Sequence, residues 1–578
     1  MKNQTDLSVV LTKYENLFLL FLVLLVGVMY ARTLNSPFIF DDEPNIVSNY
    51  HIRMSKLSLK SLADAAFRSP AAQRPLPNIS FALNYYLHAY NPIGFRLGNI
   101  LIHITTGLLL YFFVKTTLST PVLRFSADHR IWIAFFTAAI WMAHPLQTQT
   151  VTYIVQRMNS MAAMFYVLAI LLYARFRLST QHGHKWWLLA GCILAALLAL
   201  ASKQIAATIP LVIVAYEGYF FRRASSKIYL ASVAACLLLT VGIALFILGH
   251  SSLDRILAGY QQRAFTPVQR LLTQPRVVIF YLSLLFWPSP ARLNLDHDFA
   301  LSYSLLNPFS TLLALAALVA FAVLAILTAK KQPLISFGIV WFFANLVIES
   351  SIIPLEIIFE HRTYLPSMMF CLLLVLFVYR WFKPAWPGTV LLCFIVTVGA
   401  IWSYERNAVY ADRIILWRDC VAKSPNKARP YNNLGVALAD NGYHDEAIIQ
   451  YRKTLQIEPN YAETYANIGL SLVEQGNLED SIPLFLKTLE LNPNDANTHS
   501  NLGAVLVMLE RNAEAVEHLT QALKLNPYSA STHNNLGVAL KYLGKFEEAQ
   551  KHFARARRID PNFAGAHKNY MDNQKNLK

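Results

Sequence analysis

The sequence predicts an all-α protein in two parts, a polytopic membrane domain of about 11 spans followed by a superhelix of paired helices. The chain has 578 residues, of which 55% are hydrophobic and only 15% are charged, and this composition is typical of a polytopic membrane protein. A strict 34-residue period near the C-terminus predicts the superhelix. The expected boundaries are 1–404 for the membrane domain, 405–426 for a connecting helix and half-repeat, 427–562 for four repeats and 563–578 for a capping helix.

Eleven apolar runs before residue 405 are long enough to contribute membrane-spanning helices. One more apolar run, 277–287, is short, ends in Trp-Pro-Ser-Pro and has arginines on both sides, so we interpret it as an interfacial or re-entrant helix. The predicted spans are residues 17–30, 97–113, 132–142, 161–174, 187–201, 206–221, 229–248, 309–327, 335–348, 368–382 and 390–404.

The short loops between these runs carry the basic residues, and this pattern predicts the orientation. With eleven spans and the N-terminus inside, every basic cluster falls on the cytoplasmic side. The long loops 34–96 and 249–308 and the C-terminal repeats then lie outside. If 277–287 spanned the membrane, the last two clusters would move outside. The clusters are Lys115, Arg124 and Arg130; Arg175, Arg177 and Lys185; Arg222, Arg223 and Lys227; Lys330 and Lys331; and Arg380 and Lys383.

The net charge of +16 belongs to the membrane half of the chain. Residues 427–578 contain 16 Lys and Arg against 17 Asp and Glu, so the earlier residues hold the whole basic excess. A basic excess between membrane spans follows the positive-inside pattern, and we do not interpret it as nucleic-acid binding. The five cysteines show no disulfide or metal-ligand spacing, and most lie in apolar runs.

The C-terminal period belongs to tetratricopeptide repeats, which are pairs of antiparallel helices stacked into a superhelix. A half-repeat at 414–425 is expected to continue directly from the last membrane helix. Prolines recur every 34 residues, and glycines and small residues recur in step with them. These positions are Pro425, Pro459, Pro493, Pro527 and Pro561; Gly435, Gly469, Gly503 and Gly537; and Ala447, Ser481, Ala515 and Ala549.

One repeat position carries an asparagine in all four repeats: Asn433, Asn467, Asn501 and Asn535. We expect this position to face the inner groove, where a ladder of amides can pair with the backbone of an extended peptide. The alternative is that asparagine is simply common at this position and bonds locally. The sequence leaves both interpretations open.

Two aspartates, Asp41 and Asp42, follow the first span in the sequence Phe-Asp-Asp-Glu, which ends at Glu43. Carboxylates at a membrane face can serve as a base or as metal ligands for a lipid-linked substrate. The competing interpretation is the start of a loop with solvated acids.

Several polar islands are predicted at the same membrane face as the acid pair. Arginine and lysine there can hold a phosphate or pyrophosphate, although a single arginine can also snorkel to the interface. Acids and cations together are what an enzyme acting on a lipid phosphate needs. The islands contain Arg74, Arg96, Asn99, His103, His144, Arg157, Lys203, Asp296, His297, Asp298, Glu360, His361 and Arg362.

The order of these motifs along nearly the whole chain resembles the transmembrane and tetratricopeptide-repeat O-mannosyltransferase family. The resemblance implies the GT-C fold, a polyprenyl-phosphate donor with mannose as the sugar in characterised members, and protein Ser or Thr hydroxyls as acceptors. It also implies that the acid at the start of the first outer loop, Asp41 or Asp42, is the base. The sequence departs from the family at Gln149, where Glu is expected, and at Gln156, where Gly is usual.

The predicted reaction is an inverting transfer in which Asp41 or Asp42 accepts the proton of the acceptor hydroxyl. The predicted ligands of the donor phosphate are Arg157, Lys203, His361 and Arg362, because a phosphate leaving group needs charge neutralisation. The mechanism requires no cofactor, and a divalent metal is compatible with it. The predicted supporting residues are Glu43, Arg74, Asn99, His103, His144 and Glu360.

The predicted partners are a polyprenyl-phosphate sugar donor, a protein or peptide acceptor in the repeat groove, and the lipid bilayer. The compact size resembles bacterial members of the family, so the expected location is a bacterial inner membrane with the repeats in the periplasm. Two alternatives remain: a membrane-anchored repeat scaffold without enzymatic activity, and an oligosaccharide ligase that uses a pyrophosphate lipid.

Overall fold

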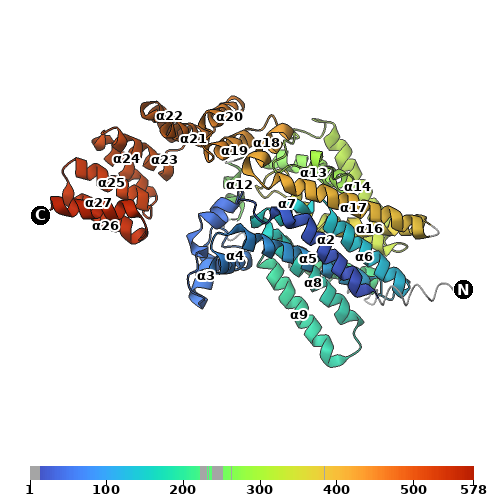
Figure 1. Ribbon diagram of the computed structural model, residues 1–578. Helices are drawn as coiled ribbons and strands as arrows, with labels where there is room; N and C mark the ends of the chain where they lie inside the picture. The colour runs from blue at the N-terminus through green and yellow to red at the C-terminus, as the bar shows by residue number, and fades with distance from the viewer. Residues whose placement is uncertain are drawn as a thin grey trace. The chain divides into compact units, whose positions relative to one another are not determined.

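The computed structural model describes residues 14–221, 231, 233–236, 238, 242, 252–261, 263–382 and 385–577. These residues form helices and connecting loops, with no strand in any of the described ranges (Figure 1). The all-α prediction is therefore confirmed. The chain divides into two compact units, Met1–Leu416 and Trp417–Lys578, and each is considered by itself below.

Long apolar helices make up most of the first unit, which we call the membrane unit. Every predicted span in the described residues coincides with a helix; 229–248 falls largely outside those residues, as do Arg222, Arg223 and Lys227. The helices are α2 (Glu15–Tyr30), α5 (Pro92–Thr117), α6 (Ala127–Ala143), α8 (Arg157–Leu178), α9 (His182–Leu200), α10 (Ile209–Phe220), α14 (Ser310–Thr328), α15 (Pro333–Ala344), α16 (Ser367–Trp381) and α17 (Ala385–Val409).

Five helical segments of the described chain are long and apolar enough to cross a membrane. Four further apolar helices have 10–17 residues. The protein is therefore a membrane protein, while the count of eleven spans stays a prediction. The five segments are Glu15–Thr33, Pro92–Thr117, Ile154–Leu178, Ser310–Thr328 and Ala385–Val409.

Shorter helices occupy the connections between the apolar ones. The short run 277–287 forms the second half of α13, a 20-residue helix that starts at a capping box of Thr266 and Gln269. Helix α13 is not one of these five long or four shorter apolar helices, and its interfacial placement stays a prediction. The helices in these connections are α3 (Leu59–Arg68), α4 (Pro75–His88), α7 (Gln147–Thr152), α12 (Ser252–Tyr260) and the longer α13 (Pro267–Phe286).

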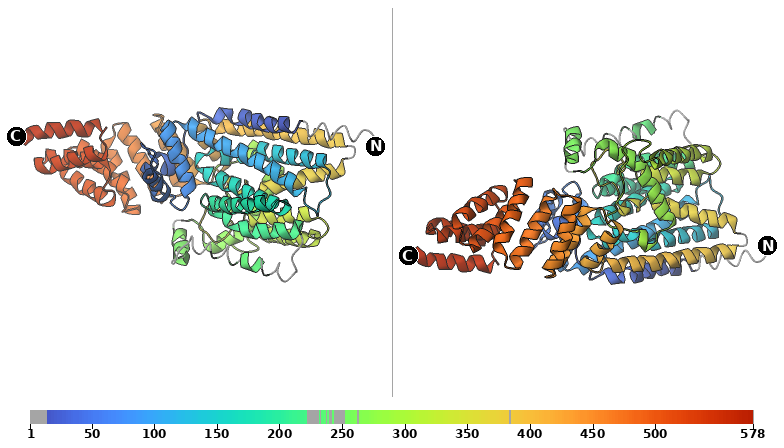
Figure 2. Two further views of the ribbon diagram at one scale, coloured as in Figure 1. Left: turned by 90° about the horizontal axis from the view of Figure 1, so that it is seen from below. Right: turned by 90° about the horizontal axis from the view of Figure 1, so that it is seen from above.

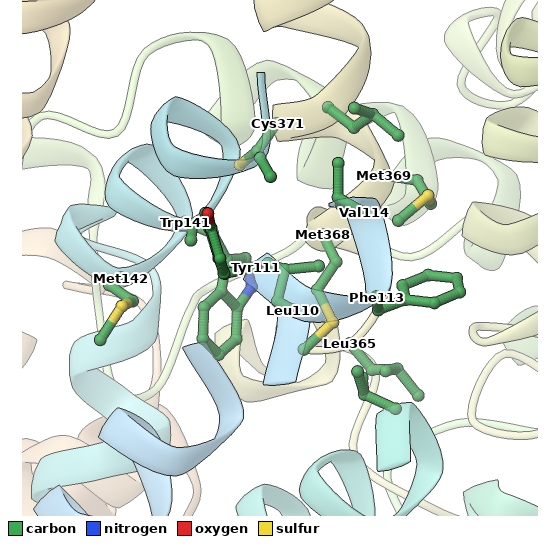
Figure 3. Close-up of a cluster of buried hydrophobic side chains, with 14 of the residues drawn as sticks. Leu110, Tyr111, Phe113, Val114, Trp141, Met142, Leu365, Met368, Met369 and Cys371 are labelled. Carbon is green, nitrogen blue, oxygen red and sulfur yellow. The ribbon is translucent and has the colours of Figure 1, made fainter. Parts of the chain in front are cut away.

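The core of the membrane unit gathers side chains from most of its apolar helices, and Figure 3 shows the part where α5, α6 and α16 meet. The indole nitrogen of Trp141 donates to the Tyr364 carbonyl at 3.0 Å and to the Ser367 hydroxyl at 3.1 Å. Large aromatic side chains fill this core, and Trp341 likewise donates from its indole nitrogen to the Leu365 carbonyl at 2.9 Å. The packing fixes the ends of these helices, where the polar loops begin.

The second unit is a stack of helix pairs, which we call the repeat unit (Figure 2). Helix α17 ends at Val409 and α18 begins at Arg413, with a turn between them, so the predicted continuity of the half-repeat with the last membrane helix is wrong. The helices are α18 (Arg413–Lys423), α19 (Ala428–Ala439), α20 (His444–Ile457), α21 (Ala462–Glu474), α22 (Leu478–Leu491), α23 (Ala496–Met508), α24 (Asn512–Leu525), α25 (Ala530–Tyr542), α26 (Phe546–Ile559) and α27 (Ala564–Asn576).

The periodic glycines allow the two helices of each repeat to pack closely. A Cβ atom on Gly435 would lie 2.4 Å from the ring of Tyr451, and one on Gly537 would lie 2.6 Å from the ring of Phe553. The same conflict arises at the other two periodic glycines, with Phe485 and Leu519. Only a residue without Cβ fits at these positions, which explains the glycine period seen in the sequence.

Candidate functional site

The two aspartates after the first span have different environments. Asp42 is completely buried, and its two carboxylate oxygens accept hydrogen bonds from the backbone N–H groups of Ile39 at 3.0 Å and Val155 at 2.7 Å. Burial raises the pKa of Asp42 to about 7, against the lowering effects of these hydrogen bonds and of Arg96. The contacts make Asp42 a link between the start of the outer loop and the segment before α8.

Asp41 is half-buried, and its backbone N–H donates to the Tyr153 hydroxyl at 2.7 Å. The preceding residue, Phe40, has a φ of +47°, a strained conformation for a bulky residue. This backbone turn places the two neighbouring acids differently, with Asp42 inside and Asp41 at the boundary of the protein. Glu43 is exposed and accepts a hydrogen bond from the Ser48 hydroxyl.

Arg96, near the start of α5, holds the loop that leads to the two aspartates by hydrogen bonds. We call this loop, residues 36–42, the acid loop. The guanidinium of Arg96 donates to the carbonyls of Ser36 and Pro37 in the loop and to the carbonyl of Thr152. Asn99, one turn further along α5, donates to the carbonyls of Val151 and Ile154 at 3.0 and 3.3 Å. Asn99 thus joins α5 to the segment before α8, and its supporting role stays a prediction.

Arg157, the first residue of α8, donates a hydrogen bond from each of its three guanidinium nitrogens. It donates to Asn99 at 2.7 Å, to Asn84 at 2.5 Å, and to the carbonyl of Phe95 at 2.6 Å. Its guanidinium carbon also lies 4.7 Å from the ring centre of Phe81. All of these partners are neutral, so Arg157 provides a buried positive charge near Asp42 while its hydrogen bonds are used within the protein.

The other predicted cations gather around a carboxylate that the sequence analysis did not single out, Glu349. Lys203 donates to Glu349 at 2.6 Å and to the Asn159 amide oxygen at 3.1 Å, and both charged side chains are buried. Burial pushes the pKa of Glu349 upward, but Lys203, Arg362 and Arg74 outweigh it, so that pKa lies below its ordinary value. Glu349 therefore stays ionised as the shared counter-ion of three cations.

Arg74 connects this cluster to the acid pair. Its charge interacts with both Glu349 and Asp41, and it is half-buried at the start of α4. Asp41, Arg74, Glu349, Lys203 and Arg362 therefore form one continuous group of interacting charges. We call these five residues the charge cluster.

Arg362 and His361 both keep an unused polar atom inside the protein. Arg362 donates to the carbonyls of Glu356 at 2.7 Å and Ile357 at 3.1 Å, while its Nε has no hydrogen-bond partner. The Nδ1 atom of His361 also has none. Burial, with Lys203, Arg362 and Arg74 nearby, lowers the pKa of His361 well below its ordinary value, so its imidazole is neutral at pH 7.

Arg270 in α13 holds the loop that carries Glu349. Its guanidinium donates to the carbonyls of Glu349, Ser351 and Leu355 at 2.5–2.9 Å. This residue was not singled out from the sequence, because an arginine beside a short apolar run looks the same whether it binds lipid, solvent or a loop. Its contacts show that α13 positions the cluster's carboxylate.

The remaining predicted supporting residues lie outside the charge cluster. The Glu360 carboxylate contacts His297 at 2.8 Å and accepts from the backbone N–H of Asn294 at 2.6 Å, which ties two polar islands together. His144 contacts the carbonyl of Leu285 at 3.2 Å. His103 is completely buried in the core, where it contacts the Tyr364 hydroxyl at 2.8 Å and the Met142 carbonyl at 3.2 Å.

The repeat unit has a groove of about 450 Å³. Asn467 and Asn501 line it together with Glu463 and Asp495, whereas Asn433 and Asn535 are not among its lining residues. The amide of Asn467 also donates to Asn432 at 3.1 Å. The two central asparagines therefore line the groove, as peptide binding would require, and Asn467 also makes a local hydrogen bond. Peptide binding by these amides stays a prediction.

The comparisons with known proteins fit both units. Models of the tetratricopeptide repeat match residues 428–461, 460–527 and 496–562, which confirms the predicted repeats. Over 456 residues the chain is 24% identical to Protein O-mannosyl-transferase F38B6.6 of Caenorhabditis elegans, covering 74% of this chain and 61% of that protein. It is 24% identical over 471 residues to Protein O-mannosyl-transferase TMTC4 of Mus musculus, covering 72% and 63%. This chain is a homologue of the protein O-mannosyl-transferases.

A third O-mannosyl-transferase, TMTC3 of Homo sapiens, is 22% identical over 485 residues, covering 74% of this chain and 50% of that protein. In these three alignments the chain spans between half and two thirds of the length of its O-mannosyl-transferase relatives. Among solved structures, MamA aligns at 22% identity over 26% of this chain and 82% of that chain, with a TM-score of 0.24. The peptide-binding repeat protein YrrB aligns at 21% identity over 28% and 81%, also with a TM-score of 0.24.

Gln149, where the O-mannosyltransferase resemblance leads us to expect Glu, has a defined place in this structure. Its amide oxygen accepts from the backbone N–H of His361 at 2.7 Å, and its amide nitrogen donates to the carbonyl of Leu295 at 3.4 Å. An ionised Glu could make only the first of these contacts, because it has no donor for Leu295. Glutamine at position 149 therefore makes both local hydrogen bonds, where glutamate would make one.

Proposed function

We propose that this protein is a membrane glycosyltransferase that moves mannose, or another monosaccharide, from a polyprenyl-phosphate donor to Ser or Thr hydroxyls of proteins. The observation that supports it best is the charge cluster, in which a half-buried aspartate is linked to buried cations on loops between apolar helices. The homologous O-mannosyl-transferases support the sugar and the acceptor. The lipid-phosphate donor is our inference from the cations.

In the proposed reaction Asp41 is the general base. The acceptor hydroxyl attacks the anomeric carbon of the sugar while Asp41 takes its proton, and the bond from that carbon to the phosphate oxygen breaks. Asp41 is preferred over Asp42 because both oxygens of Asp42 are held by backbone N–H groups in a completely buried site. Asp42 is then a positioning residue. A single displacement of this kind inverts the anomeric centre.

The leaving phosphate is proposed to bind at Lys203, Arg362 and Arg74, with His361 beside them. The Nε atom of Arg362 and the Nδ1 atom of His361 have no hydrogen-bond partner, so the site holds unused polar atoms for a ligand. Glu349 balances the cations when no phosphate is present, and it leaves them positively charged overall. The cations stabilise the charge that develops on the phosphate as its bond to the sugar breaks.

The groove of the repeat unit is proposed to hold the protein acceptor. Amide side chains at Asn467 and Asn501 can bond to the backbone of an extended chain whatever its sequence. Binding one part of the acceptor raises the effective concentration of its hydroxyl groups at the site of transfer. This arrangement suits an enzyme that modifies proteins of differing sequence.

The proposed location is a bacterial inner membrane, with both the charge cluster and the repeats on the periplasmic side. This follows from eleven spans and the positive-inside pattern of the short loops. A periplasm-specific reporter fused after Lys578 should be active, and the same reporter fused at Lys330 should be inactive. The reverse result at Lys578 would show that the span count is wrong.

The experiment that tests the proposed function is intact-mass analysis of envelope proteins from cells with and without this protein. We expect hexose or pentose increments that disappear with the protein and return with the wild-type chain. They should not return with Asp41→Asn. An unchanged mass profile, together with loss of an envelope complex, would favour the alternative of a membrane-anchored scaffold.

The ligase alternative differs in the donor and in the size of the transferred group. An oligosaccharide ligase would add a whole glycan in one step and would release a pyrophosphate lipid. Single-sugar increments and release of a monophosphate lipid, measured with purified protein in detergent, would separate the two enzymes.

A further inference from the structure

Two pairs of histidines occur in neighbouring repeats, 34 residues apart. In the first pair, His499 of α23 faces His518 of α24 with their Nδ1 atoms 3.1 Å apart. In the second, His533 of α25 faces His552 of α26 with their Nδ1 atoms 3.0 Å apart. The rings of both pairs are tilted by 32°, with centres 5.4 and 5.2 Å apart. The same geometry is therefore built twice.

A backbone carbonyl fixes the orientation of the first ring in each pair. The Nε2 atom of His499 contacts the carbonyl of Pro493 at 3.2 Å, and that of His533 contacts the carbonyl of Pro527 at 3.2 Å. Because a carbonyl only accepts hydrogen bonds, Nε2 carries the proton, and the Nδ1 lone pair of a neutral ring points at its partner. Histidines that bind metals commonly use one nitrogen for the metal and donate from the other to such a carbonyl.

The separation of the facing nitrogens suits two ligands of one metal ion. Zinc binds histidine nitrogen at about 2.0–2.1 Å, so two nitrogens on one ion lie roughly 3.0–3.4 Å apart. A carboxylate also follows the same period, since Glu514 and Glu548 each lie four residues before the second histidine of a pair. Residues four apart share one face of a helix. Glu514 interacts with His518, and Glu548 with His552.

We propose that each histidine pair binds one divalent transition-metal ion, such as Zn²⁺, through its two Nδ1 atoms. Among the described residues no three His, Cys, Asp or Glu side chains are already gathered as a metal-binding group. Water, or a rotated Glu514 or Glu548, therefore completes the coordination, and each site is weaker than a structural zinc centre. Each ion joins the two helices of its repeat and stiffens the superhelix, independently of sugar transfer.

The test is isothermal titration of Zn²⁺ into the full-length protein in detergent, purified with a tag that contains no histidine. The wild-type chain should bind two more ions than the double variant His518→Ala and His552→Ala. Each single variant should lose one ion, and Zn²⁺ should raise the melting temperature of the wild type more than that of the double variant.

His567 provides the matched control. It holds the equivalent position in α27 and contacts the carbonyl of Pro561 at 2.8 Å, but the described residues place no histidine against it. His567→Ala should leave the number of bound ions unchanged. If the Ala variants do not fold, His518→Gln and His552→Gln keep a hydrogen-bonding side chain of similar length. Equal Zn²⁺ binding by the wild type and a folded double variant would overturn the proposal and leave two histidine–histidine hydrogen bonds.

Discussion

The membrane unit and the repeat unit build their candidate sites in opposite ways. The membrane unit joins segments far apart in sequence, since 113 residues separate Asp42 from Val155 and 146 separate Lys203 from Glu349. The repeat unit reuses one local contact, in which each periodic glycine packs against a side chain 16 residues later. A site of unique contacts depends on each member, whereas a periodic site spreads its binding over several copies.

The largest effect is expected at the acid pair, where Asp41→Asn keeps the shape but removes the base. General-base assistance is worth about 10²–10⁴ in rate, so transfer by Asp41→Asn should fall by that factor. The rate is measured with purified protein and labelled donor. Glu43→Gln is the matched control, because Glu43 is an exposed neighbour, and it should keep nearly full activity.

Asp42→Asn separates a positioning role from a catalytic one. An amide at this position turns its NH₂ group toward one of the two backbone N–H donors, and losing that hydrogen bond should cost roughly 1–3 kcal/mol of stability. We expect a lower melting temperature with partial activity. A stable Asp42→Asn protein without activity, beside an active Asp41→Asn protein, would reverse the two roles.

The next effect concerns the leaving phosphate. Removing the guanidinium with Arg362→Ala should slow transfer by roughly 10–100-fold, because hydrogen bonds to charged groups contribute about 1.5–3 kcal/mol. Arg362→Lys should recover only part, since an ammonium cannot reproduce the guanidinium fork. The equivalent change Arg380→Lys alters an exposed residue outside the charge cluster, which donates to the Gln332 amide oxygen at 2.9 Å, and should have no effect. Equal rates for all three variants would remove Arg362 from the donor site.

A smaller effect is expected in the repeat unit, where several residues share the binding. The double variant Asn467→Ala and Asn501→Ala should raise KM for a protein acceptor by roughly 5–30-fold, at about 1 kcal/mol for each lost amide contact. Turnover of a short peptide should stay near normal. Asn433→Ala with Asn535→Ala changes the same repeat position outside the groove and serves as the control. If both double variants behave alike, the asparagines support folding rather than recognition.

The smallest effects are expected from substitutions that relieve backbone strain, one in each unit. Glycines with φ near +80° turn the chain at 442, 476 and 544, while the equivalent turn in the third repeat places Glu510 at φ +60°. Glu510→Gly should stabilise the repeat unit by about 1 kcal/mol in chemical unfolding, without changing transfer.

Phe40→Gly relieves similar strain in the membrane unit but frees the acid loop, so the rate of sugar transfer should fall. Unchanged transfer by Phe40→Gly would show that the loop needs no such restraint.

The sequence was most informative where structure follows local pattern. Apolar runs located the helices of the membrane unit, and the 34-residue period located the repeat helices and the glycines between them. The break between α17 and α18 was missed, because no glycine or proline marks the turn between Val409 and Arg413. The number of membrane spans and the side of the membrane are still predictions.

The candidate site was only partly predictable, because its members meet through tertiary contacts. Lys203, His361 and Arg362 were identified as polar residues in loops between apolar runs. Glu349 was missed because it ends an apolar run and looks like the start of an ordinary loop. One sequence signal could have identified it, since an acid at that position needs a cation nearby. Nothing in the sequence distinguishes the buried Asp42 from its neighbour Asp41.

The close packing of each glycine against its own repeat has a consequence for how such proteins diversify. Each helix pair carries its own internal contact, so a whole repeat is a unit that gene duplication can add or remove without redesigning the others. Lengthening the array extends the groove proposed to bind the acceptor in steps of 34 residues while the membrane unit keeps its sequence. If the proposed function holds, acceptor choice and sugar chemistry are then free to evolve at different rates within one polypeptide.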